Sequence, residues 1–152
     1  MAGVTHPPVS VNAVAELLGF TVLAFGFPDH VSAVTFVEED VKSIGVNSHH
    51  SAARRRFTVA HELGHYLCGH HSRDRGAIHV EDCQEPAERR SRQEIEADEF
   101  AMEILMPEPH LLRDLDELGL DVPSLARRYQ VTEHAMWLQL ISLNATGRAP
   151  ST

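Results

Sequence analysis

One stretch of the chain concentrates side chains that bind metal ions. The segment TVAHELGHYLCGHH, residues 58–71, contains four histidines, one glutamate and one cysteine. Within it, His61, Glu62 and His65 form an HExxH pattern, which on a helix places the two histidines one turn apart on the same face. Glu62 is offset from them and can reach a water molecule on the same ion without binding the ion itself. The pattern therefore predicts a zinc site with Glu62 as its general acid and base.

A catalytic zinc ion usually takes three protein ligands, and the sequence offers two candidates for the third. His71 lies ten residues after His61, the spacing of metzincins, although that class has glycine where this chain has Cys68. Glu94 begins the segment EIEADEFA, in which Asp98 follows four residues later on the same helical face. One carboxylate could bind the ion while the other holds a ligating imidazole by its second nitrogen. We favour Glu94, because a second helix packed on the first would fix both carboxylates on rigid elements, and His71 is its rival.

A peptide hydrolase also needs a donor that stabilises the oxyanion formed during the reaction. The sequence offers Tyr66, His49, His50 and His79, and their positions do not select one of them.

The spacing of apolar residues predicts the elements that must position these side chains. Residues 9–18 have the pattern of a short amphipathic helix that ends at Gly19. Three β-rich runs follow it, at residues 21–25, 32–37 and 42–47. Because turn-forming residues separate the runs, we expect a small antiparallel sheet. From Ala52 onward the apolar period lengthens to about 3.6, which predicts a buried helix that carries the HExxH pattern.

The second half of the chain has helical spacing after one polar segment. Residues 72–91 are irregular and typical of a loop. A second helix should run from about Gln93 to Leu105, with Pro107 ending it, and residues 108–144 have the pattern of several short helices.

The chain shows no internal repeat and no low-complexity tract. We therefore expect one α+β domain over residues 1–144 and a flexible tail over residues 145–152.

The overall composition excludes several classes of protein. The formal net charge of −9 argues against a nucleic-acid binder, because affinity for phosphates depends on Lys and Arg. No apolar run approaches the roughly 18 residues of a membrane-spanning helix, and the N-terminal MAGVTHPPVS lacks the regions of an export signal. We therefore expect a cytoplasmic protein in which Cys68 and Cys83 are reduced thiols.

Three segments of the chain resemble a known family. RRRFTVAHELGHYL, EIEADEFAMEILMP and LARRYQVTEHAMWLQLISL, in this order, are similar to the ImmA/IrrE-type metallopeptidases over roughly residues 42–143. The resemblance implies a zincin-like helical core against which the sheet packs, with a C-terminal group of short helices. It also implies that His61, His65 and Glu94 bind Zn²⁺, as in gluzincins, and that Glu62 is the general acid and base.

The resemblance extends to Asp98 and to the kind of substrate. The family often has Asn at this position, and Asp98 is similar to the ExxxD pattern of thermolysin-like enzymes, so it keeps the role of holding a ligating histidine. Family members typically act beside a helix-turn-helix regulator, in prophages, mobile elements, stress responses or toxin–antitoxin pairs. The expected function is therefore a zinc endopeptidase that cleaves such a regulator or antitoxin. The alternative is a metal-stabilised regulatory binding protein, or a toxin–antitoxin component, without proteolytic activity.

Overall fold

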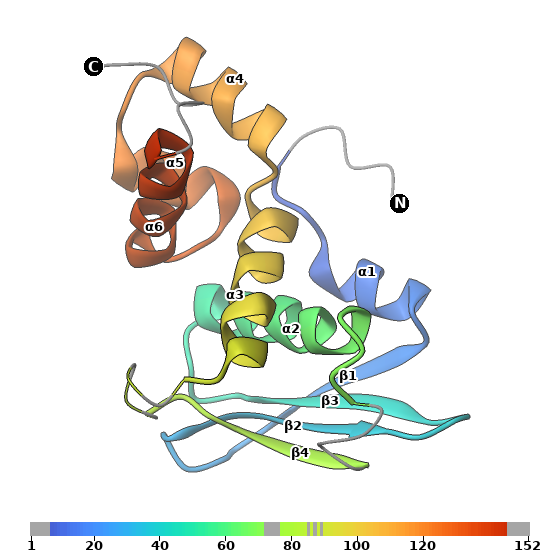
Figure 1. Cartoon of the computed structure of the whole chain (residues 1–152). Helices are drawn as coiled ribbons and strands as arrows, with labels where there is room; N and C mark the ends of the chain where they lie inside the picture. Colours follow the sequence, from blue (N-terminus) through green and yellow to red (C-terminus); the bar gives the residue numbers. More distant parts are fainter. Residues whose placement is uncertain (1–6, 72–76, 85, 87, 89, 146–152) are drawn as a thin grey trace.

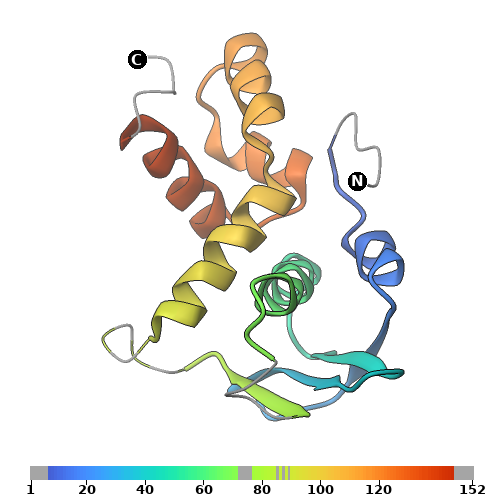
Figure 2. The same cartoon turned by 45° about the vertical axis from the view of Figure 1, so that its right-hand side comes forward.

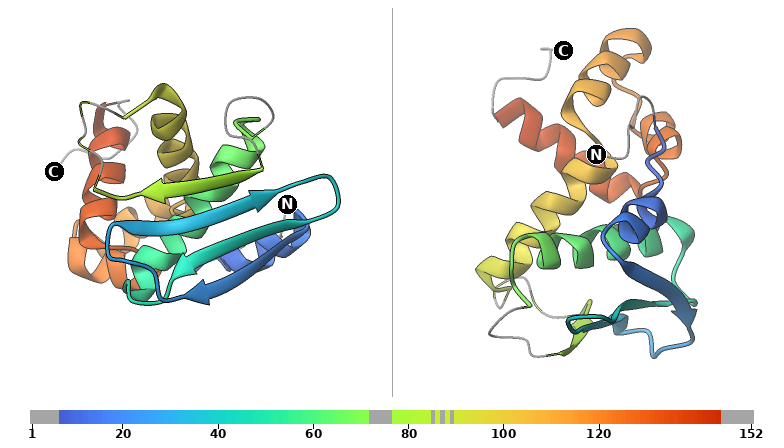
Figure 3. Two further views of the ribbon diagram at one scale, coloured as in Figure 1. Left: turned by 90° about the horizontal axis from the view of Figure 1, so that it is seen from below. Right: turned by 90° about the vertical axis from the view of Figure 1, so that its right-hand side faces the viewer.

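The first two thirds of the chain build a four-stranded sheet with helices on one of its faces (Figure 1). The computed structural model describes residues 7–71, 77–84, 86, 88 and 90–145. The elements of this part are α1 (Val11–Leu17), β1 (Phe20–Phe25), β2 (Val31–Val37), β3 (Lys42–Asn47), α2 (Ala52–Leu67), β4 (Ile78–Asp82) and α3 (Arg92–Leu105). Figure 3 shows the opposite face of the sheet, with the helices behind it. The predicted α+β class is confirmed.

The sheet is mixed rather than antiparallel throughout. Its order is β1-β3-β2-β4, and β2 pairs antiparallel with both of its neighbours. β1, however, pairs parallel with β3, from Phe20 opposite Lys42 to Phe25 opposite Asn47. The prediction of an antiparallel sheet was wrong at this edge. The reason is that β2 does not pair with β1, so β3 returns between them and runs in the same direction as β1.

β4 forms the other edge of the sheet, inside residues 72–91, where the sequence predicted only a loop. The strand has an inverted burial pattern, because Ile78 and Val80 are exposed while Glu81 is buried. Alternation with apolar side chains inward is the usual signal of a half-buried strand, and this strand reverses it. A polar side chain that points inward is the first indication that β4 serves a site.

α2 lies above the sheet and carries the HExxH pattern (Figure 1). The side chain of Ser51 accepts a hydrogen bond from the backbone N–H of Arg54 and so caps the start of the helix. Of the apolar stripe that the sequence predicted, at Phe57, Ala60, Leu63, Gly64 and Leu67, Ala60 and Leu63 are buried in the main core, and Val59 outside the stripe is buried there as well. The stripe ends one turn early, because Leu67 at the last position of the helix is 46% exposed.

α3 packs closely on α2 at Gly64, and Figure 2 shows α3 passing beside α2, which is seen nearly end-on. A Cβ atom on Gly64 would lie 2.9 Å from the carbonyl oxygen of Ala97 and 3.1 Å from Cβ of Phe100. Only glycine permits this approach of the two helices. The contact brings Glu94 and Asp98 of α3 alongside the histidines of α2.

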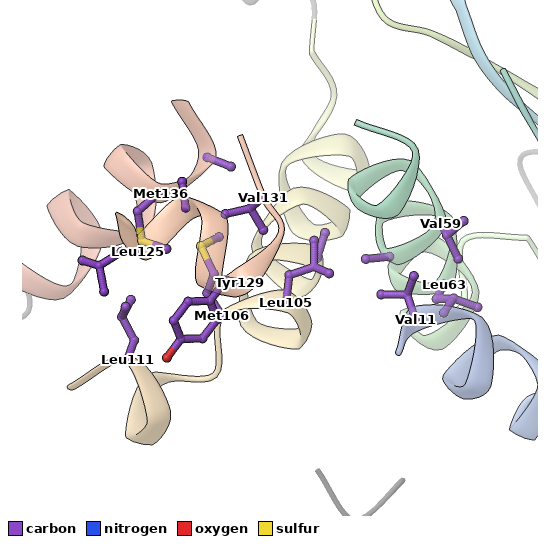
Figure 4. Close-up of a cluster of buried hydrophobic side chains, with 14 of the residues drawn as sticks. Val11, Val59, Leu63, Leu105, Met106, Leu111, Leu125, Tyr129, Val131 and Met136 are labelled. Carbon is purple, nitrogen blue, oxygen red and sulfur yellow. The ribbon is translucent and has the colours of Figure 1, made fainter. Parts of the chain in front are cut away.

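Three short helices follow α3, as the sequence predicted: α4 (Glu108–Leu118), α5 (Val122–Tyr129) and α6 (Glu133–Ala145). Their buried side chains, among them Leu111, Tyr129 and Met136, join one hydrophobic cluster with those of α2 and α3 (Figure 4). Among the described residues, no helix is both long enough and apolar enough to cross a membrane.

Candidate metal centre

The three HExxH side chains lie in the interior between α2, the sheet and α3. His61 is 5% exposed, and Glu62 and His65 are fully buried. The Nε2 atoms of His61 and His65 are 3.0 Å apart, so both rings point to one place. Buried polar groups of this kind require partners, and the partners define what the site can do.

Asp98 orients the first histidine. Its Oδ1 lies 2.8 Å from Nδ1 of His61, and because a carboxylate only accepts hydrogen bonds, Nδ1 carries the proton. The guanidinium of Arg90 holds the other oxygen of Asp98. Nε2, the other ring nitrogen, therefore faces the centre of the site, and it is the atom that would bind a metal ion once the proton it carries in the metal-free protein is displaced. This is the arrangement that the sequence predicted for Asp98.

His70 orients the second histidine, a role that the sequence did not suggest. Nε2 of His70 faces Oε1 of Glu96 at 3.6 Å, which favours a proton on that nitrogen. Nδ1 of His70 can then accept from Nδ1 of His65, at 2.8 Å, which turns Nε2 of His65 toward the centre of the site. His70 is 7% exposed, so it is not the solvated helix end that its position after α2 would indicate.

Two carboxylates complete the centre. Oε2 of Glu94 lies 2.5 Å from Nε2 of His65 and 3.3 Å from Nε2 of His61. Oε1 of Glu81, on β4, lies 2.7 Å from Nε2 of His61 and 3.2 Å from Nε2 of His65. We call His61, His65, Glu81 and Glu94 the metal cluster. Local spacing in the sequence gives no sign of Glu81, because strand pairing brings it here.

The cluster shifts the pKa values of its own members. Burial would lower the pKa of His61, but hydrogen bonds to Asp98, Glu81 and Glu94 outweigh burial and raise it well above the ordinary value. The pKa of His65 is raised as well, since its contacts with Glu81 and Glu94 outweigh the effect of burial. Burial acts in the opposite sense on the two carboxyl groups, yet the histidines hold the pKa of both Glu81 and Glu94 below the ordinary range. Without a metal ion, protons on the histidines compensate the negative charge.

Glu62 lies beside the metal cluster with one oxygen held and one available. The hydroxyl of Thr35 on β2 donates to Oε2 at 2.7 Å, while Oε1 is buried with no hydrogen-bond partner among the described residues. Burial, and next the charge of Glu81, raise the pKa of Glu62 to about 7. A carboxyl group with this pKa can take up and release a proton near neutral pH.

The donor set fits a divalent metal ion. Two groups of donor atoms each lie within 4.8 Å of one another, one formed by His61, Glu62, His65 and Glu81 and the other by His65, His79, Glu81 and Glu94. Imidazole nitrogen and carboxylate oxygen are ligands that zinc accepts. Three buried carboxylates against two central imidazoles leave negative charge that a cation would neutralise in place of the protons, and Nε2 of both rings faces inward.

The remaining predicted residues lie at different distances from the cluster. The ring of His71, the rival ligand, has its centre 6.2 Å from that of His65, and His71 belongs to neither group of donor atoms. Among the four oxyanion candidates, only His79 reaches the cluster, with Nε2 at 3.4 Å from Oε1 of Glu81. The ring of Tyr66 packs against Phe20.

The other two candidates lie elsewhere: His50 contacts Asp29 and Asn47, and His49 lies against Gly26. Both cysteines are free and exposed, in agreement with the reduced thiols expected.

An open cleft leads to the cluster. His61, Glu81 and Asp98 contribute to its wall, and the other lining residues come from α2, β2, β4, α3, α6 and the segments next to them. The wall is mixed in character, with the apolar Phe57 of α2 and Leu138 of α6. A chain segment with both apolar and polar side chains could contact it.

Comparisons with known proteins agree with this geometry. Residues 15–139 match the protein family Peptidase M78, described as the IrrE N-terminal-like domain. A solved structure described as a Mycobacterium tuberculosis transcriptional regulator has the same fold, with a TM-score of 0.65 and 22% sequence identity. The similarity covers 91% of this chain and 42% of that one, so this chain spans about two fifths of the length of the matched structure. No curated protein matches the chain significantly.

Proposed function

Because the chain belongs to the Peptidase M78 family of IrrE N-terminal-like domains, we propose that it is a zinc-dependent endopeptidase. His61, His65 and Glu94 would hold the metal ion, and Glu62 would be the general acid and base. The observation that carries this proposal is the buried Glu62 with an unpaired Oε1 directly beside the converging donor atoms. A purely structural metal site has no need of such a carboxylate.

The chain's own residues would divide the chemistry among them. A bound zinc ion would act as a Lewis acid and make a water molecule more acidic. Oε1 of Glu62 would receive the proton of that water and later pass it to the leaving amine, while Thr35 keeps Oε2 in place. Asp98 and His70 would keep the two imidazoles turned toward the ion. His79 is the candidate that lies best to stabilise the oxyanion.

The proposed substrate is a helix-turn-helix regulator or an antitoxin. The support is the family, the similarity in fold to a protein described as a transcriptional regulator, and a cleft with apolar and polar walls. The net charge of −9 favours a protein substrate over direct nucleic-acid binding. We further propose that the protein acts in the cytoplasm.

The first test is metal content, measured by elemental analysis of purified wild type and four variants. We expect about one zinc per chain in wild type, in Glu62→Gln and in His71→Ala, and loss of zinc in His61→Ala and Glu94→Ala. Loss of zinc in His71→Ala with retention in Glu94→Ala would make His71 the third ligand.

The second test is proteolysis. Wild type and Glu62→Gln are each co-expressed with helix-turn-helix regulators of the same genome, and new N-termini are identified by mass spectrometry. We expect cleavage of a regulator by wild type and a rate lower by a factor of about 10² to 10⁴ in Glu62→Gln.

The alternative function is a metal-stabilised binding protein, and the position of Glu81 inside the cluster is the observation that favours it. A protein of this kind would bind its partner equally well with Glu62→Gln and cleave nothing.

A further inference from the structure

We propose that Glu81 is a fourth protein ligand of the metal ion and closes the site in the resting enzyme. This inference rests on the proposed function only in requiring that a metal ion binds between His61 and His65. It makes β4, the edge strand, part of the metal centre.

The distances from the histidine Nε2 atoms to Glu81 are as suitable for a metal ligand as the distances to Glu94. Tetrahedral zinc with bonds of about 2.0 to 2.1 Å separates its ligand atoms by about 3.3 Å. Oε1 of Glu81 is 2.7 and 3.2 Å from Nε2 of His61 and His65, and Oε2 of Glu94 is 3.3 and 2.5 Å from the same two atoms. The two carboxylates thus approach the histidines in mirrored fashion, and an outward shift of less than 1 Å would give each atom the spacing of a zinc ligand.

The backbone of β4 directs Glu81 inward by a specific device. The register of β2 against β4 shifts between Val31 and Ala33, which leaves Ser32 as the extra residue of a bulge. The hydroxyl of Ser32 donates to the carbonyl oxygen of Glu81 at 3.3 Å. Bulges commonly redirect a side chain beside a functional site, and here Glu81 is 8% exposed while Asp82 next to it is exposed.

The surroundings of Glu81 are those of a ligand rather than of an ordinary ion pair. Among the residues that the structure describes, its charge partners are the imidazoles of His61, His65 and His79, without the fixed positive charge of a guanidinium or ammonium group. His79 stands two residues before Glu81 on the same face of β4 and touches the same oxygen. A carboxylate held by an imidazole beside a metal ion is a familiar way to orient a ligand.

A closed site has a functional consequence. Catalytic zinc keeps one position open for water, whereas four protein ligands leave none. Activity would therefore require Glu81 to withdraw, and β4 suits this movement because, among the described strands, it pairs only with β2. Contact of a substrate with the edge of β4 could displace Glu81 and open the site.

The test compares Glu81→Gln with Asp82→Asn, which removes the same charge at the next, exposed position of the strand and keeps the oxygen that accepts from the N–H of Gln84. Zinc affinity is measured by competition with a chromogenic chelator. Residues that support a metal ligand typically contribute about 10- to 100-fold to metal affinity, and we expect Glu81→Gln to weaken zinc binding by at least this much. Asp82→Asn should change zinc affinity by less than about threefold. Zinc binding by Glu81→Gln at wild-type strength would overturn the inference and leave the proposed function intact.

Cobalt substitution gives a second readout, and its decisive measurement uses wild type, so that it does not depend on the folding of a variant. In wild type, azide added to the cobalt protein should leave the visible absorption spectrum unchanged, because no position is open. In Glu81→Gln the same addition should change the spectrum. A spectral change in wild type at equal azide concentration would overturn the inference. Failure of wild type to bind zinc or cobalt at all would instead remove the proposed metal function, and this inference with it.

Discussion

Two buried polar clusters of this chain satisfy their charges in different ways. In the C-terminal helices, Asp114 is 1% exposed and accepts hydrogen bonds from the Tyr129 hydroxyl at 2.6 Å and from Nε of Arg128 at 2.9 Å. We call these three residues the Asp114 cluster. It contains one carboxylate, one fixed positive charge and one neutral donor, and needs nothing from outside.

The metal cluster collects carboxylates instead of separating them. The carboxylates of Glu81 and Glu94 both contact the imidazoles of His61 and His65, and Glu62 lies buried beside them. Such an arrangement is costly to bury unless protons or a cation compensate it. A buried charge cluster that is complete by itself stabilises the fold, whereas a cluster with surplus charge of one sign indicates a site for a ligand.

The largest expected effect is stabilisation of the whole protein by zinc. With free zinc about 1,000-fold above its dissociation constant, the free energy of unfolding should rise by about 4 kcal/mol, because only the folded chain assembles the cluster. Thermal unfolding with and without zinc measures the shift. His61→Ala should abolish it, while Asp114→Ala should keep it. An equal response to zinc in wild type and His61→Ala would contradict the division between the clusters.

The next effect concerns the Asp114 cluster. Asp114→Ala should lower the free energy of unfolding by about 2 to 3 kcal/mol, because it leaves the buried Tyr129 hydroxyl without its acceptor. Arg128 adds little to this loss, since its half-exposed side chain can turn to water. Urea unfolding measures the change, and Asp116→Ala, at an exposed position of the same helix, should cost less than about 0.5 kcal/mol. Zinc affinity should be unchanged in both variants; a loss of zinc in Asp114→Ala would couple the two clusters.

A smaller effect is expected at the helix contact that assembles the metal cluster. Gly64→Ala should cost about 1 to 3 kcal/mol, because the new Cβ atom would meet the carbonyl oxygen of Ala97 at 2.9 Å. It should also weaken zinc binding, since α3 must shift and carries Glu94. The control Ala53→Gly, in the first turn of α2, should cost at most about 1 kcal/mol and leave zinc binding unchanged. Unaltered zinc affinity in Gly64→Ala would show that the position of α3 does not set the site.

Local spacing explains what could be predicted from the sequence. His61, Glu62 and His65 share one helix, and Glu94 and Asp98 share another. The helical period places the two histidines on one face with Glu62 offset beside them, and it places Glu94 and Asp98 together on one face of the other helix. In the structure Glu94 and Asp98 lie next to the histidines of α2, which is the arrangement that Glu94 needs to be the third ligand. The α+β class and the C-terminal helices follow from apolar spacing in the same way.

Contacts between distant segments explain what could not be predicted. Glu81 enters the cluster through the pairing of β2 with β4 and a bulge at Ser32, and its strand has apolar side chains outward, against the usual pattern. Thr35 meets Glu62 through the packing of the sheet on α2. His70 follows α2 directly, yet its role depends on how the chain folds back after Cys68, which spacing does not determine.

The smallest expected effect is the pH dependence of the stability that the Tyr129 hydroxyl contributes to the Asp114 cluster. Burial, and then the hydrogen bond to Asp114, raise the pKa of the Tyr129 hydroxyl above its ordinary value of about 10. A group whose pKa is raised by folding stabilises the protein fully below its unfolded pKa and loses that contribution as pH rises through the folded pKa. Tyr129→Phe should therefore be less stable than wild type by about 1 kcal/mol at pH 8, and the gap should narrow above pH 10. Urea unfolding of both proteins from pH 8 to 11 measures this difference in the free energy of unfolding. The titration of all other groups is common to the two proteins and cancels in the difference. A constant gap over this range would mean that the Tyr129 proton is not what holds Asp114 in place.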